Sequence, residues 1–131
     1  MRVNLPVTDI EYLVEEGEVL VSKTDLNGTI TYCNRAFSDA SGFLESELIG
    51  LPHNIVRHPD VPEQIFADCW GTIKTGNSWH GILKNRRKNG DFSWRFFVHA
   101  TKSPDLAWVC ALTETRTQNQ FLKRELLYQL S

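Results

Sequence analysis

Two short stretches with β-type residues lie near the start of the chain. Residues 19–23 read Val-Leu-Val-Ser-Lys, residues 29–33 read Thr-Ile-Thr-Tyr-Cys, and an Asn-Gly pair lies between them at 27–28. Both residues of such a pair tolerate positive φ, so the pattern predicts two strands joined by a tight hairpin turn.

A block of short helices is predicted to follow this hairpin. Asn34 is a favourable N-cap for a helix over residues 35–41, and Gly42 ends that helix. A second short helix is expected over residues 44–48 and stops before the next glycine. Residues 51–60 contain two prolines and two histidines, which favours an irregular loop with one helical turn.

A longer helix and a second hairpin come next. Between Pro62 and Gly76, apolar side chains recur at helical spacing, which predicts an amphipathic helix. Residues 79–87 and 92–100 are strand-like on either side of the Asn-Gly pair at 89–90, which again predicts a hairpin.

The C-terminal part predicts one more strand, over residues 106–115, and an amphipathic helix over 118–131. In that helix Leu122, Leu126 and Leu130 recur at i, i+4 and i+8. Their exposed face would need a partner, and a second copy of the chain, in a homodimer, is one expectation.

Two strands, a helical block and three further strands predict an α+β domain. Strands on both sides of one helical insertion favour an antiparallel sheet with helices over one face and a cavity between the two layers. We therefore expect an N-terminal cap with one helical turn at 1–17, the folded domain at 18–116 and a C-terminal linker helix at 117–131.

Composition narrows the class of protein. The 131 residues are 41% hydrophobic and 23% charged, which suits one soluble domain, and the net charge of −2 gives no general attraction to nucleic acid. Cys33, Cys69 and Cys110 are far apart, which predicts reduced thiols, a cytoplasmic location and no zinc site. We see no signal peptide and no apolar run long enough to span a bilayer, although a parent protein attached to the inner membrane fits this pattern.

No residue pattern predicts catalysis. The sequence lacks a nucleophile-elbow motif, a phosphate-cradling glycine-rich loop and a metal-spaced His/Cys cluster, so we expect no enzyme. The basic run of Lys84 and residues 86–88 fits nucleic-acid binding as a minor alternative, but it coincides with a hairpin tip and is interpreted mainly as a solvated turn.

Several motifs resemble those of PAS domains. Residues 25–34, Asp-Leu-Asn-Gly-Thr-Ile-Thr-Tyr-Cys-Asn, are similar to the start of such a domain, and residues 41–50 fit the same family. Residues 50–62, Gly-Leu-Pro-His-Asn-Ile-Val-Arg-His-Pro-Asp-Val-Pro, together with 66–70 and 84–91, resemble the FAD-binding PAS domain of bacterial aerotaxis receptors.

This resemblance implies a PAS fold, with a five-stranded antiparallel sheet, short helices over one face and a ligand cavity between them. It implies non-covalent FAD as the cofactor, and redox or oxygen sensing passed to a HAMP and chemoreceptor-type signalling region of the parent protein. Reduction would add charge in a pocket of low dielectric constant and bias two packings of the sheet.

The resemblance also marks candidate cofactor contacts. Asn85 matches a strand position where the related light-oxygen-voltage domains carry a flavin-contacting Asn, because a carboxamide pairs with the donors and acceptors of a flavin edge. By pattern alone, Asn85 is a strand-end residue that bonds to the turn. Asn34 is a further candidate contact, besides its expected role as a helix cap.

The loop before the long helix holds three charged or polar candidates. Arg57 and His58 offer donors to a pyrophosphate, and the following helix N-terminus adds its dipole. Asp60 would orient Arg57 or His58 or cap the helix. The alternative is a solvated arginine and a salt bridge that stiffens the loop.

His53 lies where the light-sensing relatives carry a reactive cysteine, so no cysteinyl adduct is expected. A histidine near the flavin ring responds to reduction by protonation or rotation, but His53 is equally compatible with simple packing against the loop. Trp79 and Trp70 are candidates for the aromatic wall of the pocket, and the alternative for both is the core.

Three other functions stay open at this point. A haem-binding PAS sensor would use His53 or His58 as the axial ligand. A cofactor-free PAS domain would serve in dimerisation or small-ligand binding. A flavin-dependent oxidoreductase is the third, and the residues leave FAD, FMN and no cofactor undistinguished.

Overall fold

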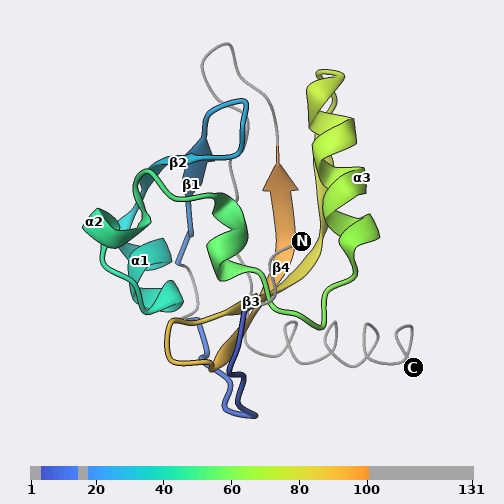
Figure 1. Cartoon of the computed structure of the whole chain (residues 1–131). Coiled ribbons are helices and arrows are strands. Elements are labelled where there is room, and N and C mark those ends of the chain that lie inside the picture. The colour runs from blue at the N-terminus through green and yellow to red at the C-terminus, as the bar shows by residue number, and fades with distance from the viewer. Residues whose placement is uncertain (1–3, 15–17, 101–131) are drawn as a thin grey trace.

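The computed structural model describes residues 4–14 and 18–100, and it has the α+β arrangement predicted from the sequence. Along the chain, two β-hairpins flank a helical block. In Figure 1, α1 and α2 lie on one side of the view, and α3 (Glu63–Lys74), the longest helix of the described residues, lies beside the second hairpin on the other. Within the described ranges, no helix combines the length and the apolar character that crossing a membrane requires.

The first hairpin pairs β1 (Ser22–Thr24) with β2 (Ile30–Cys33) in antiparallel register. Its Asn-Gly turn is confirmed: Gly28 has φ of 85°, and the Asp25 carboxylate accepts hydrogen bonds from the backbone N–H groups of Asn27 and Thr29.

The first strand starts three residues later than the prediction of 19–23. The reason is the Asn34 side chain, whose amide donates to Val19 O and whose carbonyl accepts from Val21 N. These bonds hold the approach to β1 against the start of the helical block.

The helical block follows the predicted caps closely. Asn34 accepts a hydrogen bond from Phe37 N at 3.0 Å and starts α1 (Arg35–Ser41), and Gly42 ends it with φ of 75°. The second helix is α2 (Glu45–Leu48). The single helical turn expected in the loop is the 3-10 helix η1 (His53–Val56).

The second hairpin pairs β3 (Trp79–Arg86) with β4 (Phe92–Ala100). Two features of the turn require glycine at position 90. The φ of Gly90 is 100°, and a Cβ there would lie 2.9 Å from the Pro6 carbonyl oxygen of the N-terminal segment.

Residues 4–14 form an extended segment, and the helical turn expected within 1–17 is absent from these residues. Their backbone groups bond to the hairpin tip instead: Thr8 N donates to Gly90 O, and Phe92 N donates to Ile10 O, both at 2.9 Å. In a single helical turn, most backbone N–H and C=O groups would bond only to water. Along the edge of the hairpin, the backbone groups of this segment find partners in the protein.

Two buried clusters hold the elements together. One joins the first hairpin, α1 and α2 to β4 of the second hairpin and includes Leu20, Ile30, Phe37, Leu48 and Trp94. The other packs α3 on β3 and includes Val61, Cys69, Ile73, Trp79 and Leu83. Helices α1, α2 and α3 therefore each bury one face against the strands or their neighbours.

The described strands form two separate two-stranded sheets, β1-β2 and β3-β4. The single sheet of five strands needs the strand predicted at 106–115, which lies outside the described residues, as does the predicted linker helix at 117–131.

Candidate functional site

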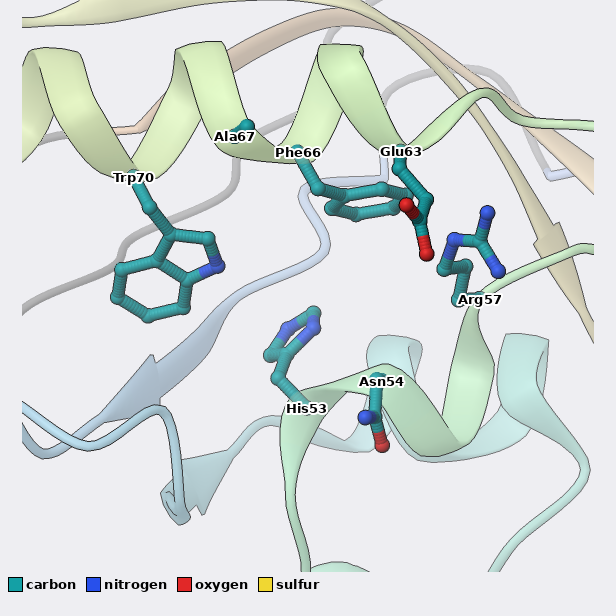
Figure 2. A pocket seen from close by; sticks show the side chains of 7 residues that line it. All are labelled: His53, Asn54, Arg57, Glu63, Phe66, Ala67 and Trp70. Carbon is teal, nitrogen blue, oxygen red and sulfur yellow. The ribbon is translucent and has the colours of Figure 1, made fainter. Parts of the chain in front are cut away.

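A pocket of about 350 Å³ opens between η1 and α3. His53, Asn54 and Arg57 line one wall, and Glu63, Phe66, Ala67 and Trp70 line the other. Figure 2 shows the rings of Phe66 and Trp70 hanging from α3 toward His53, with Arg57 and Glu63 at the end away from Trp70. The volume lies at the lower end of the range for small-molecule sites.

The wall on α3 is one face of that helix. Residues 63, 66, 67 and 70 recur at i, i+3, i+4 and i+7, while the buried Cys69 and Ile73 face the core. From the sequence, Trp70 is a candidate for the pocket wall, whereas Glu63, Phe66 and Ala67 are not singled out as cofactor contacts. The spacing of these four residues marks a common helix face, but only the position of η1 in the fold shows that this face lines a pocket.

His53 is held from the side of β1. The Ser22 hydroxyl, fully buried, lies 2.9 Å from His53 Nε2, and the two groups hydrogen-bond in either tautomer of the imidazole. The Phe37 ring packs against the imidazole with a centroid distance of 6.0 Å. The first hairpin therefore orients a side chain that lines the pocket.

Arg57 is buried at the end of η1, where its guanidinium donates to Val61 O and lies 5.6 Å from the centre of the Phe66 ring. Its backbone forms an isolated antiparallel bridge with Asn85 of β3. Arg57 therefore lines the pocket and also contacts the loop that follows it in sequence and the second hairpin.

Asn85 is buried beside Arg57, with 7% of its surface exposed. Across the hairpin it pairs with the equally buried Ser93. In the described part of the chain, the buried hydroxyl of Thr24 on β1 has no hydrogen-bond partner. A buried polar group is normally paired, so this hydroxyl suits a ligand with a complementary group.

His58 and Asp60 lie behind the pocket rather than on its walls. His58 is 2% exposed, and its Nδ1 accepts a hydrogen bond from Asp60 N at 3.1 Å. Burial lowers the pKa of His58, and the positive charges of Lys84, Arg86 and Arg57 lower it further, while Asp60 opposes them. His58 is therefore favoured as the neutral imidazole.

The Asp60 carboxylate accepts a hydrogen bond from Lys84 Nζ at 2.9 Å, and this bond lowers the pKa of Asp60. From the sequence, Asp60 is expected to orient Arg57 or His58, or to cap the helix. In the structure its carboxylate contacts His58 and Lys84. The cap prediction is wrong, because Pro62 is the N-cap of α3 and no side chain of the described residues bonds to that helix end.

The remaining predicted contacts lie elsewhere. The Asn34 carboxamide is occupied by the backbone around α1, as described above. Trp79 is 8% exposed in the cluster between α3 and β3, and its indole N–H donates to Asp68 at 2.9 Å. Its ring lies directly over Gly81, where a Cβ would come within 2.3 Å of it.

The structure therefore brings three of the predicted residues, His53, Arg57 and Trp70, into one pocket, with Asn85 adjacent through the backbone of Arg57. A second hollow of about 410 Å³ lies at the hairpin tip, beside Gly42, Arg87, Lys88 and Asn89. Arg87 already donates to Ala40 O and Lys88 already pairs with Glu47, so the cations of this hollow are less available to a ligand.

Comparison with known proteins identifies the family. The profile of the PAS fold matches residues 30–100. Over 88 residues, 67% of this chain, the sequence is 50% identical to the aerotaxis receptor of Escherichia coli K12. Over 78 residues, 60% of this chain, it is 30% identical to the nitrogen fixation regulatory protein of Klebsiella pneumoniae. The matched parts are 17% and 16% of those relatives, so the chain spans about a sixth of their length.

Among solved structures, a light-oxygen-voltage domain studied with a flavin analogue has a TM-score of 0.62 to this chain. The match covers 86% of this chain and 88% of that one, at 18% sequence identity. Likeness at this identity establishes the fold, and it agrees with the arrangement of hairpins and helices described above.

Proposed function

The chain belongs to the PAS fold family, and on that premise we propose that it is a cytoplasmic redox sensor domain that binds FAD non-covalently. Its output is passed to a chemotaxis-type signalling region of the parent protein. The 50% identity to an aerotaxis receptor supports both the flavin and the output, since the matched residues include the whole pocket-forming stretch singled out in the sequence.

The pocket between η1 and α3 carries this proposal. It joins two aromatic rings, Phe66 and Trp70, to the donors of His53 and Arg57. A flat heteroaromatic ligand with an anionic or polar part needs both kinds of surface, because the rings bury its faces and the cation pairs with its charge. The chemistry of the lining therefore fits a flavin nucleotide.

Two buried polar groups outside the pocket lining fit the same ligand. Asn85 can donate and accept at the edge of a flavin, and Thr24 adds a hydroxyl on the inner side of β1. When bound, the flavin supplies reversible electron transfer. The protein contributes orientation, exclusion of water and a hydrogen-bond set around the ring, in which His53 and Ser22 couple the pocket to β1.

The visible absorption spectrum of the purified protein, before and after dithionite, tests the proposal. We expect bands near about 450 nm that bleach on reduction, and FAD as the mass of the released cofactor. A Soret band would point to a haem sensor. A featureless spectrum that persists after FAD is added would leave a cofactor-free PAS module and end the redox proposal.

Two substitutions test the site. Arg57→Ala and Asn85→Ala should each weaken FAD binding by about tenfold, because each removes a hydrogen bond made in a buried setting. Titration of FAD into flavin-free protein measures this.

The matched controls are Arg35→Ala, whose side chain is 95% exposed, and Asn77→Ala in an exposed turn, and both should bind FAD like the unsubstituted protein. Far-UV circular dichroism confirms that each variant is folded. Full flavin content in both site variants would contradict the assignment of this pocket.

A further inference from the structure

The two walls of the pocket are joined by one short connection, residues 57–61. It follows η1, which carries His53, and it precedes α3, which carries Phe66 and Trp70. The distance between the walls therefore depends on how this connection is held.

Within the connection, most bonds are local. Val61 N donates to His58 O at 3.1 Å, Asp60 N donates to His58 Nδ1 at 3.1 Å, and the Arg57 guanidinium donates to Val61 O. These bonds make residues 57–61 a compact unit. They do not attach that unit to the sheet.

Lys84 on β3 provides an attachment. Its Nζ donates to Asp60 Oδ2 at 2.9 Å, and its side chain is only 16% exposed. The same ammonium group lies 4.5 Å from the centre of the Phe92 ring and 5.6 Å from that of Trp94. The rings of Phe92 and Trp94 therefore help to position the Lys84 ammonium group for its hydrogen bond to the Asp60 carboxylate.

The second attachment is the backbone bridge between Arg57 and Asn85, next to Lys84 in sequence. The bridge holds the start of the connection, and the Lys84–Asp60 pair holds its middle. Without the pair, residues 58–61 would be held to the second hairpin by packing alone: the His58 ring meets the edge of Phe92 on β4 at 6.4 Å, and Val61 packs in the cluster with Leu83 of β3.

We propose that Lys84 is a positioning residue for the pocket: it holds residues 57–61 against β3 and so sets the separation of the η1 and α3 walls. Lys84 does not line the pocket itself. Through this contact Asp60 and His58 act on the ligand indirectly, although they are not on the pocket wall. The inference rests on the proposed flavin function for its effect on binding, and on the contacts alone for its effect on the loop.

The size of the effect follows from exposure. Asp60 is 67% exposed, and an ion pair with one solvated partner contributes little. The contact of the Lys84 ammonium group with the rings of Phe92 and Trp94 adds a further contribution. Together these lead us to expect about fivefold weaker FAD binding for Lys84→Met, which keeps the apolar stem of the side chain and removes its charge.

Four variants test the pair. Lys84→Met and Asp60→Asn each remove one partner, and the double variant should bind FAD no more weakly than Lys84→Met alone, within about twofold. Lys84→Arg keeps the charge and can also lie over the aromatic rings, so it should retain affinity within about twofold of the unsubstituted protein. The matched control is Lys88→Met, because Lys88 also pairs with a carboxylate, Glu47 at 2.6 Å, but at the hairpin tip away from the pocket.

Hydrogen exchange in flavin-free protein tests the loop directly. The amides of Asp60 and Val61 should exchange about fivefold faster in Lys84→Met, and unchanged in Lys88→Met. Equal FAD affinity in Lys84→Met and Lys88→Met, or additive losses in the double variant, would overturn the proposal. Failure of the unsubstituted protein to bind FAD would overturn the proposed function instead, and the exchange rates would then decide whether Lys84 holds the loop.

Discussion

At the scale of the residue, burial decides the charge of His58. The imidazole is 2% exposed, and its Nδ1 is an acceptor for the Asp60 amide, so a proton on that nitrogen would break the bond. The lowered pKa of the buried ring means that the unfolded chain binds a proton more readily than the folded one. The resulting stability is fully present above the ordinary pKa of 6.5 and is lost as the pH falls below it toward the folded value.

We therefore predict that the free energy of unfolding decreases between pH 7 and pH 5, and that His58→Asn flattens this decrease. Asparagine keeps an acceptor near the position of Nδ1 but does not titrate. Urea unfolding at several pH values measures the slope. The exposed His80 is the control, and His80→Asn should leave the slope as it is. An unchanged slope in His58→Asn would show that another group is responsible.

At the scale of the element, the N-terminal segment stabilises η1 through one side chain. The buried Asn4 amide donates to Arg57 O at 2.8 Å and to Asn54 O at 2.9 Å, with a longer bond to Ile55 O. These carbonyls end the 3-10 helix, and a helix end needs such partners. Since Asn54 and Arg57 line the pocket, the segment at 4–14 supports one pocket wall from behind.

Asn4→Ala should lower the free energy of unfolding by about 1–3 kcal/mol, because buried carbonyl groups lose their donor. FAD binding should weaken with it, as the end of η1 loosens. The neighbouring Leu5, 68% exposed, offers a control in the same segment, and Leu5→Ala should change stability by no more than about 0.5 kcal/mol. Equal stability of the two variants in urea would contradict the role given to Asn4.

At the scale of the whole molecule, the pocket lies where the two buried clusters meet the connection between η1 and α3. His53 is linked to the first hairpin through Ser22, and Arg57 to the second through Asn85. A ligand in this place contacts both η1 and α3, the two elements that residues 57–61 connect. Binding should therefore stabilise the domain as a unit, by mass action.

FAD at about one hundred times its dissociation constant should add about 2.7 kcal/mol of stability, and raise the melting temperature by roughly 5–15 °C. Thermal unfolding with FAD, FMN and riboflavin measures this, and the rise should be largest with FAD, the cofactor that we propose. Arg57→Ala should reduce the rise. An equal rise with riboflavin at matched concentration would contradict FAD as the preferred ligand.

Local interactions explain which parts of the fold were predictable. The Asn-Gly turns and the helix bounded by Asn34 and Gly42 depend on neighbours within a few residues, and the structure confirms them. The start of β1 was predicted too early because it depends on bonds from Asn34, more than ten residues away. The extended path of residues 4–14 depends on the hairpin tip, about eighty residues away.

The sequence by itself was enough to indicate the PAS fold and a short set of polar and aromatic candidates for cofactor contacts. The reason is that helix caps, turns and family motifs each depend on residues that are close together in the chain. Which candidates share a pocket followed from long-range packing. It placed His53, Arg57 and Trp70 together, moved Trp79 into the core, and paired Lys84 with Asp60 across 24 positions. Such contacts form only when η1, α3 and β3 pack together. No local sequence pattern specifies the distances between these three elements in the folded domain.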